Sequence, residues 1–557
     1  MKVLTDAIIA AVQDMYDVSV VPELTRPEPQ FGDWSTNVAL QLSKQIGRNP
    51  REIAQEIADK MTSVPEVKTV DVAGPGFINV TLRDDALYAA VAAESPQPLA
   101  GKRYVVEYSD PNPFKPLHAG HLYTTLVGDI IARLVEHAGA ETIRINYGGD
   151  VGLHVARSMW AIIRELGGEL PEKLTDIPEK ERPNWLGARY VEGTMADEDD
   201  PAAHSEIVEY NKRVYALHEA ADHESPFAQI YWECRQWSYE YFPELYRQLA
   251  IDPFARFIPE SDVTPLGIST VREQLAKGVF KESQSAIVFD GDAYRLHTRV
   301  FINSEGLPTY ETKDVGLSLT KWKDYQFDRS IIITANEQAQ YMQVVIKAIE
   351  QFAPEPAQRT HHLTHGMVKM TGGVKMSSRK GNVLLALDIL EAARTAVAAL
   401  GKNTSEAAVL AAVKYAFARV RIGGDITYNP DESVALEGNS GPYLQYAHAR
   451  ACSILAKAED QKEEGKKKKE ELTVDERLLL GKLTEYVDVV ERAANELMPH
   501  YICNYLYELA QVFNRFYEHN RVIGDERQAT RLHLIMLYRD TLARGLSLLG
   551  IAAPEKM

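Results

Sequence analysis

One stretch early in the chain constrains the fold more than any other, because strand and helix patterns alternate in it. Arg103–Tyr108 is a short apolar run typical of a buried strand, and residues 117–137 repeat apolar positions every three or four residues, as a half-buried helix does. Gly139 ends that pattern, and Glu141–Ile145 is again typical of a strand. A strand, a loop, a helix and a strand in this order predict a parallel sheet of the nucleotide-binding α/β type.

The whole chain, at 557 residues, is too long for one hydrophobic core, so we expect a multi-domain α/β protein. Residues 1–98 combine amphipathic helix patterns with a strand pattern and predict a small α+β domain. Residues 99–403 hold the unit above and a second core strand at Ile331–Thr334, with an insertion at about 156–300 between them. Residues 404–557 are almost wholly helical in pattern, without a candidate parallel strand, and predict an all-α helical bundle.

Composition and cysteine spacing exclude several classes of protein. No run of about 18 apolar residues occurs, so no membrane span is expected. Acidic residues interrupt the N-terminal stretch, where a secretion signal needs an apolar segment, so we expect a cytoplasmic protein. The three cysteines lie far apart without Cys-x-x-Cys spacing, which argues against a zinc site or a disulfide framework.

The formal net charge of −18 is unusual for a nucleic-acid-binding protein, because phosphate contacts come mainly from Lys and Arg. Basic residues nevertheless recur between Arg515 and Arg544 and at Lys44, Arg48 and Arg51. Either cluster alone is more typical of a solvated helix face. Net charge therefore leaves nucleic-acid binding open.

Two histidines stand at the start of the helix pattern. His118 and His121 are three positions apart, so both imidazoles project to one side, and Gly120 leaves the backbone open between them. Pro116 suits the start of a helix, where unpaired N–H groups and the helix dipole favour a phosphate. A His-x-x-His pair alone is more often a surface pair. The pattern is compatible with a nucleoside triphosphate site and needs further support.

The residues around this pair supply that support. Pro111–His121 resembles the HIGH signature of class I aminoacyl-tRNA synthetases, and Lys115–Pro116 within it resembles the arginyl branch of the family. Downstream, Lys375–Asn382 resembles the KMSKS loop in its arginyl form and follows the glycine pair Gly372–Gly373. One such tetrapeptide arises by chance, but two matching motifs in the right order argue against coincidence. The resemblance implies a Rossmann-like parallel-sheet catalytic domain.

The resemblance also implies an activity, that of an arginine–tRNA ligase. Such an enzyme uses ATP, with Mg²⁺ as part of the ATP complex, to activate L-arginine, and then passes arginine to the terminal adenosine of tRNA(Arg). By resemblance the catalytic residues are His118, His121, Lys375 and Lys380, and no metal bound by the protein itself is expected. The same resemblance adds to the ATP site Lys115, Gly120, His365, Met367, Val368, Met376 and Ser377.

Recognition of arginine requires acidic groups, because a guanidinium is a planar cation that a carboxylate binds through two hydrogen bonds. Tyr310 and Asp314 are four apart and would share one face of a helix. In arginyl-tRNA synthetases such a Tyr and Asp, a Glu and an Asn five apart, and a later Gln bind the substrate, and these spacings recur here. The resemblance therefore assigns Asp314 to the guanidinium with Tyr310 beside it. It assigns the other polar groups of the substrate to Glu107, Asn112 and Gln338.

The resemblance continues outside the catalytic domain. Phe31–Asn37 and Gly74–Asn79 resemble the N-terminal additional domain, which contacts the corner of tRNA, and Gly438–Arg450 resembles the entrance to the helical anticodon-binding domain. Aromatic residues interleaved with Arg suit stacking of unpaired bases. The candidate tRNA contacts are Phe31, Asn37, Phe77, Asn79, Tyr443, Gln445, Arg450, Tyr517 and Arg521. We expect a monomer that binds tRNA(Arg), L-arginine and ATP, without membrane association.

Two positions depart from the family pattern, and two alternatives stay open. Val151 stands where the family often has Trp, and Tyr341 replaces a commoner His. A class I synthetase for another amino acid is one alternative. The absence of zinc-ligand cysteines disfavours a cysteinyl enzyme, and the acidic pocket disfavours glutamyl and glutaminyl enzymes. The other alternative is a tRNA-binding paralogue without catalysis, which would not need His118 or Lys375.

Overall fold

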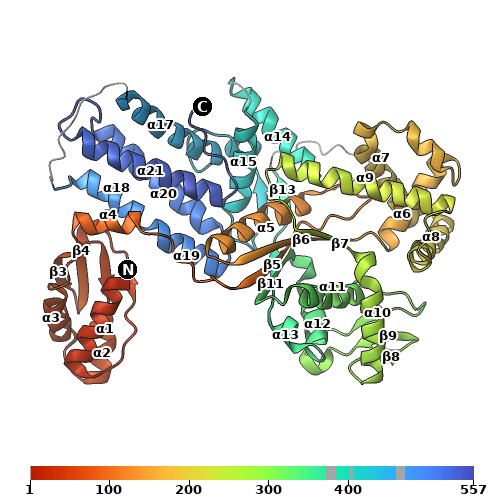
Figure 1. The fold of residues 1–557 in the computed structure, drawn as a ribbon, viewed down its shortest axis with the longest axis horizontal. Helices are drawn as coiled ribbons and strands as arrows, with labels where there is room; N and C mark the ends of the chain where they lie inside the picture. Colours follow the sequence, from red (N-terminus) through yellow and green to blue (C-terminus); the bar gives the residue numbers. More distant parts are fainter. Residues whose placement is uncertain (1, 372–383, 402–404, 460–470) are drawn as a thin grey trace.

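Three parts of different construction follow one another along the molecule (Figure 1). The computed structural model describes residues 2–371, 384–401, 405–459 and 471–557. The N-terminal part contains an antiparallel sheet of strand order β1-β2-β4-β3 and is the α+β unit that the sequence predicts. Its elements are α1 (Lys2–Tyr16), β1 (Leu24–Thr25), η1 (Pro29–Phe31), β2 (Trp34–Thr36), α2 (Val38–Ile46), α3 (Pro50–Met61), β3 (Val67–Ala73), β4 (Phe77–Leu82) and α4 (Asp84–Ala92).

A five-stranded parallel sheet of order β12-β11-β5-β6-β7 forms the middle of the molecule. The strands are β5 (Arg103–Glu107), β6 (Glu141–Gly148), β7 (Arg256–Pro259), β11 (Arg329–Ala335) and β12 (Thr360–His365). The helix α5 (Ala119–His137) connects β5 to β6 and buries the apolar stripe that its sequence predicts. Because all strands are parallel, the loops that follow β5, β6 and β11 gather at one edge of the sheet.

The region predicted as one insertion at about 156–300 is two parts, because β7 returns to the sheet between them. The first part is helical and contains α6 (Leu153–Leu166), η2 (Pro171–Asp176), η3 (Glu179–Glu181), α7 (Arg182–Asp199), α8 (Pro201–Glu219) and α9 (Pro226–Gln248). The second contains α10 (Glu260–Ala276), β8 (Lys281–Ser283), β9 (Ala286–Phe289), η4 (Asp292–Tyr294) and β10 (Arg299–Ile302). The three strands β8 to β10 form their own antiparallel sheet.

After β10 the chain adds the remaining elements of the catalytic region around β11 and β12, which are α11 (Tyr310–Tyr325), η5 (Asn336–Gln338), α12 (Ala339–Glu350), α13 (Pro354–Gln358) and β13 (Val368–Met370). The strand β13 lies outside the central sheet. Helices dominate the remainder, as expected: α14 (Ala386–Ala399), α15 (Glu406–Ala418), α16 (Pro430–Ser433), α17 (Gly441–Glu459), α18 (Val474–Thr484), α19 (Tyr486–Glu496), α20 (His500–His519) and α21 (Gln528–Leu548). One expectation is wrong, because the short strand β14 (Ile426–Tyr428) lies beyond residue 404 and pairs in parallel with β13.

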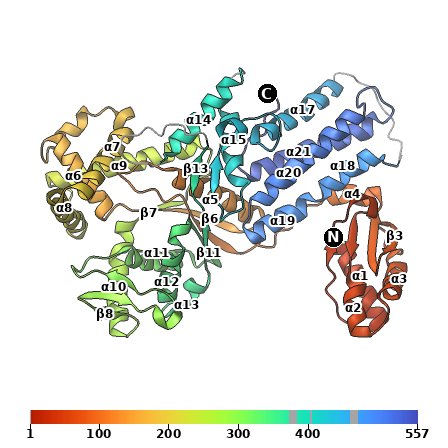
Figure 2. The same cartoon turned by 180° about the vertical axis from the view of Figure 1, so that it is seen from behind.

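The parts have a clear arrangement. The helices α17 to α21 lie on one side of the central sheet, α6 to α9 lie on the opposite side, and the N-terminal part lies below α18 (Figures 1 and 2). Leu87 of α4 and Leu479 of α18 belong to the same buried apolar core, so the N-terminal part packs on the helical part. None of the helices in the described ranges is both long and apolar enough to cross a bilayer.

Candidate functional site

Two histidines begin α5 at the edge of the sheet. His118 is the N-cap residue, and its Nδ1 accepts hydrogen bonds from the backbone N–H groups of Gly120 at 3.1 Å and His121 at 3.3 Å. Nδ1 of His121 accepts from the backbone N–H of His118 at 3.4 Å, and the two rings stack with their centroids 3.8 Å apart. A Cβ at Gly120 would lie 2.9 Å from the His118 ring, so the glycine permits this packing. The helix therefore begins after His118 rather than at Pro116.

These hydrogen bonds assign the protons of the pair. An Nδ1 that accepts from a backbone N–H carries no proton, so each neutral ring has its proton on Nε2. Burial, and then the nearby Lys115, lower the pKa of His118 to about 4. Burial, and then His118, hold the pKa of His121 well below its usual range. Both rings are therefore neutral at pH 7 and each has one Nε2–H to donate, which suits phosphate oxygens.

The chain returns to this helix start directly after the second predicted ATP motif. The backbone N–H of Ala119 donates to the carbonyl oxygen of Leu384 at 2.7 Å, and that of Ala386 donates to Leu117 at 3.0 Å. An antiparallel β-bridge joins His118 to Leu385. Residues 384–386 are thus bound to the histidine motif. The predicted residues Lys375, Met376, Ser377 and Lys380 lie outside the described residues.

The other predicted ATP-binding residues lie on both sides of this helix start. His365 is buried at the end of β12, and its Nε2 is 2.8 Å from a threonine hydroxyl of α5. Met367 follows with an exposed side chain, and Val368 begins β13. Lys115 extends toward the helical insertion, where its Nζ lies 5.3 Å from the centre of the Tyr190 ring. The structure therefore brings His365 to the histidine pair.

Glu107 is the last residue of β5, and Asn112 lies in the loop that follows this strand. Glu107 is buried, and its Oε2 accepts a hydrogen bond from Nζ of Lys321 at 2.5 Å. Oδ1 of Asn112 accepts from the backbone N–H of Gly149 at 2.9 Å. A Cβ at Gly149 would lie 2.7 Å from this oxygen, so only glycine fits. The oxygen of Asn112 therefore holds the loop after β6, and its amide nitrogen has no hydrogen-bond partner among the described residues.

Tyr310 and Asp314 lie on one face of α11, as their spacing predicts. Oδ2 of Asp314 accepts a hydrogen bond from the hydroxyl of Tyr341, and within the described ranges Asp314 has no ion pair. Burial raises the pKa of Asp314 to about 8, and the neighbouring Glu107 acts in the same direction. Tyr310 is exposed at the start of the helix, and Gln338 is exposed after β11. Of the predicted set, Glu107 and Asp314 are close neighbours, whereas Gln338 lies at the surface.

Further buried polar residues of this site are not marked by any motif in the sequence. Nζ of Lys313 donates to Oε2 of Glu260 at 2.6 Å and lies 4.8 Å from the centre of the Tyr310 ring. His154 is buried, donates from Nε2 to a backbone carbonyl at 2.7 Å, and burial lowers its pKa to about 4. The sequence carries one signal for the two lysines, which is their spacing. Lys313 and Lys321 fall on the same helix face as the apolar Leu317, and this face is buried. A single lysine is usually a surface residue, so this signal is weak.

The predicted tRNA contacts of the N-terminal part fall into two groups. Phe31 and Phe77 have exposed rings, and Asn37 is half-buried at the start of α2, where its Oδ1 accepts from Gln41 at 3.0 Å. Asn79 lies inside the sheet and is only 6% exposed. Since the side chain of Asn79 is buried, we do not include Asn79 among the proposed tRNA contacts.

In the helical part, Tyr443 and Arg450 lie on α17. Both bind Asn514, which donates to the Tyr443 hydroxyl at 2.8 Å and accepts from Arg450 at 3.2 Å. They line an open cavity of about 410 Å³. Tyr517 and Arg521 are exposed near the end of α20.

The prediction for Gln445 differs from its place in the structure. Gln445 is fully buried in α17, and its Nε2 donates to the carbonyl oxygens of Ala552 at 2.8 Å and Ala407 at 3.2 Å. This side chain holds the C-terminal segment against the helices and does not face solvent. It is therefore a structural residue in the described chain.

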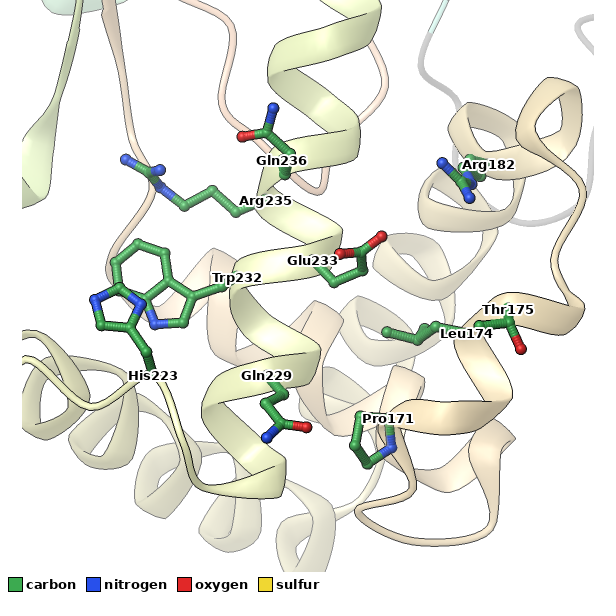
Figure 3. A pocket seen from close by; sticks show the side chains of 10 residues that line it. All are labelled: Pro171, Leu174, Thr175, Arg182, His223, Gln229, Trp232, Glu233, Arg235 and Gln236. Carbon is green, nitrogen blue, oxygen red and sulfur yellow. The ribbon is translucent and has the colours of Figure 1, made fainter.

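A larger open hollow of about 610 Å³ lies apart from this site, between η2 and α9 (Figure 3). His223 stacks on Trp232 there with ring centroids 4.6 Å apart. Arg235, in the same wall, lies 5.2 Å from the Trp232 ring and donates from Nε to Oδ2 of Asp150 at 2.9 Å. The hollow is thus connected with the loop after β6 through one arginine.

Comparison with known families agrees with this three-part construction. A model described as the arginyl tRNA synthetase N terminal domain matches residues 2–82. The model for the tRNA synthetases class I (R) catalytic domain matches residues 85–423, which is more than half of the chain. The DALR anticodon binding domain matches residues 444–557. The catalytic match extends past residue 403 and ends just before β14, the strand that pairs with β13.

Curated relatives and solved structures match over the whole length. The arginine–tRNA ligase of Treponema pallidum is 30% identical over 100% of this chain and 98% of its own. That of Phocaeicola vulgatus is 28% identical over 100% and 99%. The structure of Thermus thermophilus arginyl-tRNA synthetase covers 100% of both chains at 25% identity with a TM-score of 0.81. The Plasmodium falciparum arginyl-tRNA synthetase, at 20% identity and a TM-score of 0.76 over 100% and 99%, shares the fold.

Proposed function

Since the chain belongs to the arginyl-tRNA synthetases of class I, we propose here how its residues divide the reaction. The protein is an arginine–tRNA ligase. It activates arginine with ATP to arginyl-adenylate and pyrophosphate, and it transfers arginine to the terminal adenosine of tRNA(Arg). The division of this work among individual residues is the proposal.

Activation requires the carboxylate of arginine to attack the α-phosphorus of ATP while pyrophosphate leaves. The protein mainly positions the reactants and stabilises the charge that develops. We assign His118 and His121 to the phosphate oxygens of ATP, because their Nε2–H groups are available to donate. Both residues also lie at the N-terminus of α5, where the helix dipole favours a phosphate. Lys375 and Lys380 are assigned to the β- and γ-phosphates. The bonds of residues 384–386 to the histidine motif support this joint assignment.

The ATP enters, in this proposal, as its Mg²⁺ complex. The described residues contain no cluster of three His, Cys, Asp or Glu side chains arranged to hold a metal. We assign the ion to the phosphate oxygens of ATP, with which Mg²⁺ is commonly bound. No step is assigned to a metal held by the protein alone.

Asp314 carries the assignment of the arginine pocket. Glu107 and Glu260 are each paired with a buried lysine, whereas Asp314 has no cationic partner within the described residues. A buried carboxylate without a cation is the group that a guanidinium satisfies best. We assign Asp314 to the guanidinium with Tyr310 beside it. The ammonium and carboxylate of arginine are assigned to Glu107, Asn112 and Gln338.

For tRNA we propose two surfaces, one in the N-terminal part and one in the helical part. Stacking on exposed rings and contacts from arginine suit unpaired bases. The proposed contacts are Phe31, Asn37, Phe77, Tyr443, Arg450, Tyr517 and Arg521. We also propose that the protein acts as a monomer in the cytoplasm, and light scattering at working concentration tests the first point.

Pyrophosphate exchange with each amino acid, with and without tRNA(Arg), tests the function. We expect exchange with arginine alone and, by analogy with the family, only when tRNA(Arg) is present. Exchange with another amino acid would contradict the specificity. Asp314→Ala should abolish exchange with arginine while ATP binding persists, and an unimpaired variant contradicts the pocket assignment.

A further inference from the structure

Lys321 is a buried cation that the proposed reaction does not use. It lies on α11, is 1% exposed, and donates to Oε2 of Glu107 at 2.5 Å and to Oγ of Ser330 at 3.3 Å. A buried ammonium is costly unless a charged partner offsets the loss of water. Neither ATP nor tRNA is assigned to it. Its contacts point to Glu107 as the residue through which it acts.

Glu107 has one oxygen engaged and one available. Oε2 accepts from Lys321, whereas Oε1 has no hydrogen-bond partner among the described residues. Glu107, Lys321 and Asp314 line the same small cavity of about 20 Å³. Lys321 therefore holds the Glu107 carboxylate through Oε2, while Oε1 stays available in the region that Glu107 shares with Asp314.

Other charged or titratable groups also face Glu107. Asp110 follows β5, Asp314 lies on α11, and Tyr147 lies on β6, and each interacts electrostatically with Glu107. Two of the three are carboxyl groups, and like charges at short range repel one another. Lys321 is the cation that contacts Glu107 directly.

We propose that Lys321 is a positioning residue of the arginine site, which holds Glu107 in one orientation so that Oε1 receives the ammonium group of arginine. This inference rests on the proposed assignment of Glu107 to the substrate. A purely structural ion pair, which joins α11 to β5, would predict a lower stability of the fold with an unchanged KM for arginine. The positioning role predicts a higher KM for arginine with a kcat that changes much less.

The test is Lys321→Met, assayed by aminoacylation of tRNA(Arg) with the KM for arginine and kcat measured separately. At pH 7 the KM for arginine should rise on the order of 100-fold, because breaking a buried ion pair leaves its partner uncompensated. The kcat should change much less than the KM for arginine. The matched control is Lys323→Met, an exposed residue of the same helix, which should leave the KM unchanged.

A second comparison keeps the test decisive if Lys321→Met alone does not fold. It compares the single variant Glu107→Gln with the double variant that carries both Glu107→Gln and Lys321→Met. Removing both charges is far less destabilising than removing one. If Lys321 acts through Glu107, the double variant has no higher KM for arginine than Glu107→Gln alone. A further rise in that KM, or an unchanged KM for arginine in a folded Lys321→Met, overturns the proposal. Failure of the wild-type enzyme to use arginine would instead contradict the proposed function.

Discussion

Residues of the same type have different surroundings in this site, and the surroundings decide their roles. Glu107 and Glu260 are held by lysines at 2.5 and 2.6 Å, whereas Asp314 has only the hydroxyl of Tyr341. A buried carboxyl group without a cation stays protonated until a cation arrives. The charge of Asp314 is thus coupled to binding of the substrate.

Binding of arginine should therefore tighten as the pH rises toward 8. Burial raises the pKa of Asp314 to about 8, so this group is mainly protonated at pH 6 to 7. The guanidinium keeps its charge throughout this range and binds the ionised carboxylate. The KM for arginine should fall by about tenfold per pH unit below 8 and level off above it. Aminoacylation measured from pH 6 to 8.5 checks this slope.

The control for this slope is Asp314→Asn, which has no proton to lose. Its KM for arginine should be high, and it should lack the pH dependence of the wild type. A wild-type KM that stays constant between pH 6 and 8 is incompatible with Asp314 as the guanidinium ligand.

At the scale of secondary-structure elements, the sequence predicts those with long apolar periods. The helix α5 is the example, because its 19 residues show the 3.6-residue period, and the short apolar runs of β5 and β6 are recognisable on either side of it. β7 and β14 have four and three residues, and their place depends on pairing with distant strands. A local pattern of that length does not distinguish a strand from a loop, so both were missed.

The candidate site was predictable only where a motif marks it. The motifs locate His118 and Asp314, but they do not report which side chains are covered, as Asn79 and Gln445 illustrate. Lys321 has no motif of its own, because its role depends on Glu107, which is 214 positions away in the chain. Long-range pairing of this kind is visible only in the folded structure.

Helix α9 should hold the arginine site in place through Arg235. Asp150, which is fully buried, accepts from Nε of Arg235 at 2.9 Å and from the backbone N–H of Ser261, beside Glu260, at 2.9 Å. Arg235→Met removes the cation from Asp150. We expect the KM for arginine to rise about tenfold and the free energy of unfolding to fall by about 3 kcal/mol. Steady-state kinetics and chemical denaturation measure the two effects.

Arg247→Met provides the comparison on the same helix, because Arg247 is exposed and pairs only with Glu244 among the described residues. Its KM for arginine should match the wild type. If Arg235→Met also leaves the KM unchanged, α9 does not support the site.

At the scale of the whole molecule, ion pairs join the N-terminal part to the helical part. Arg477 of α18 donates to Asp33 at 2.6 Å and to Asp84 at 2.5 Å. These pairs add to the apolar core that α4 shares with α18. The two proposed tRNA surfaces are therefore held in one relative orientation, which a tRNA bound to both requires.

Arg477→Met should weaken this connection and raise the KM for tRNA(Arg) about five- to tenfold, while the KM for arginine stays unchanged. The reason is that a second contact surface adds to affinity only when the geometry lets both engage together. Arg492→Met, an exposed position of α19, is the control and should leave both KM values unchanged. An equal rise in both KM values for Arg477→Met would indicate general destabilisation instead.

That Asp314 recognises the charge of the substrate is tested most directly by pyrophosphate exchange with arginine and with citrulline, its neutral isostere, in the presence of tRNA(Arg). The wild-type enzyme should prefer arginine by about 10⁴-fold or more in kcat/KM, because the neutral ureido group of citrulline cannot form the ion pair that a guanidinium forms with Asp314. In Asp314→Asn this preference should fall by at least about 100-fold. A variant that keeps the wild-type preference would contradict the assignment of the guanidinium to Asp314.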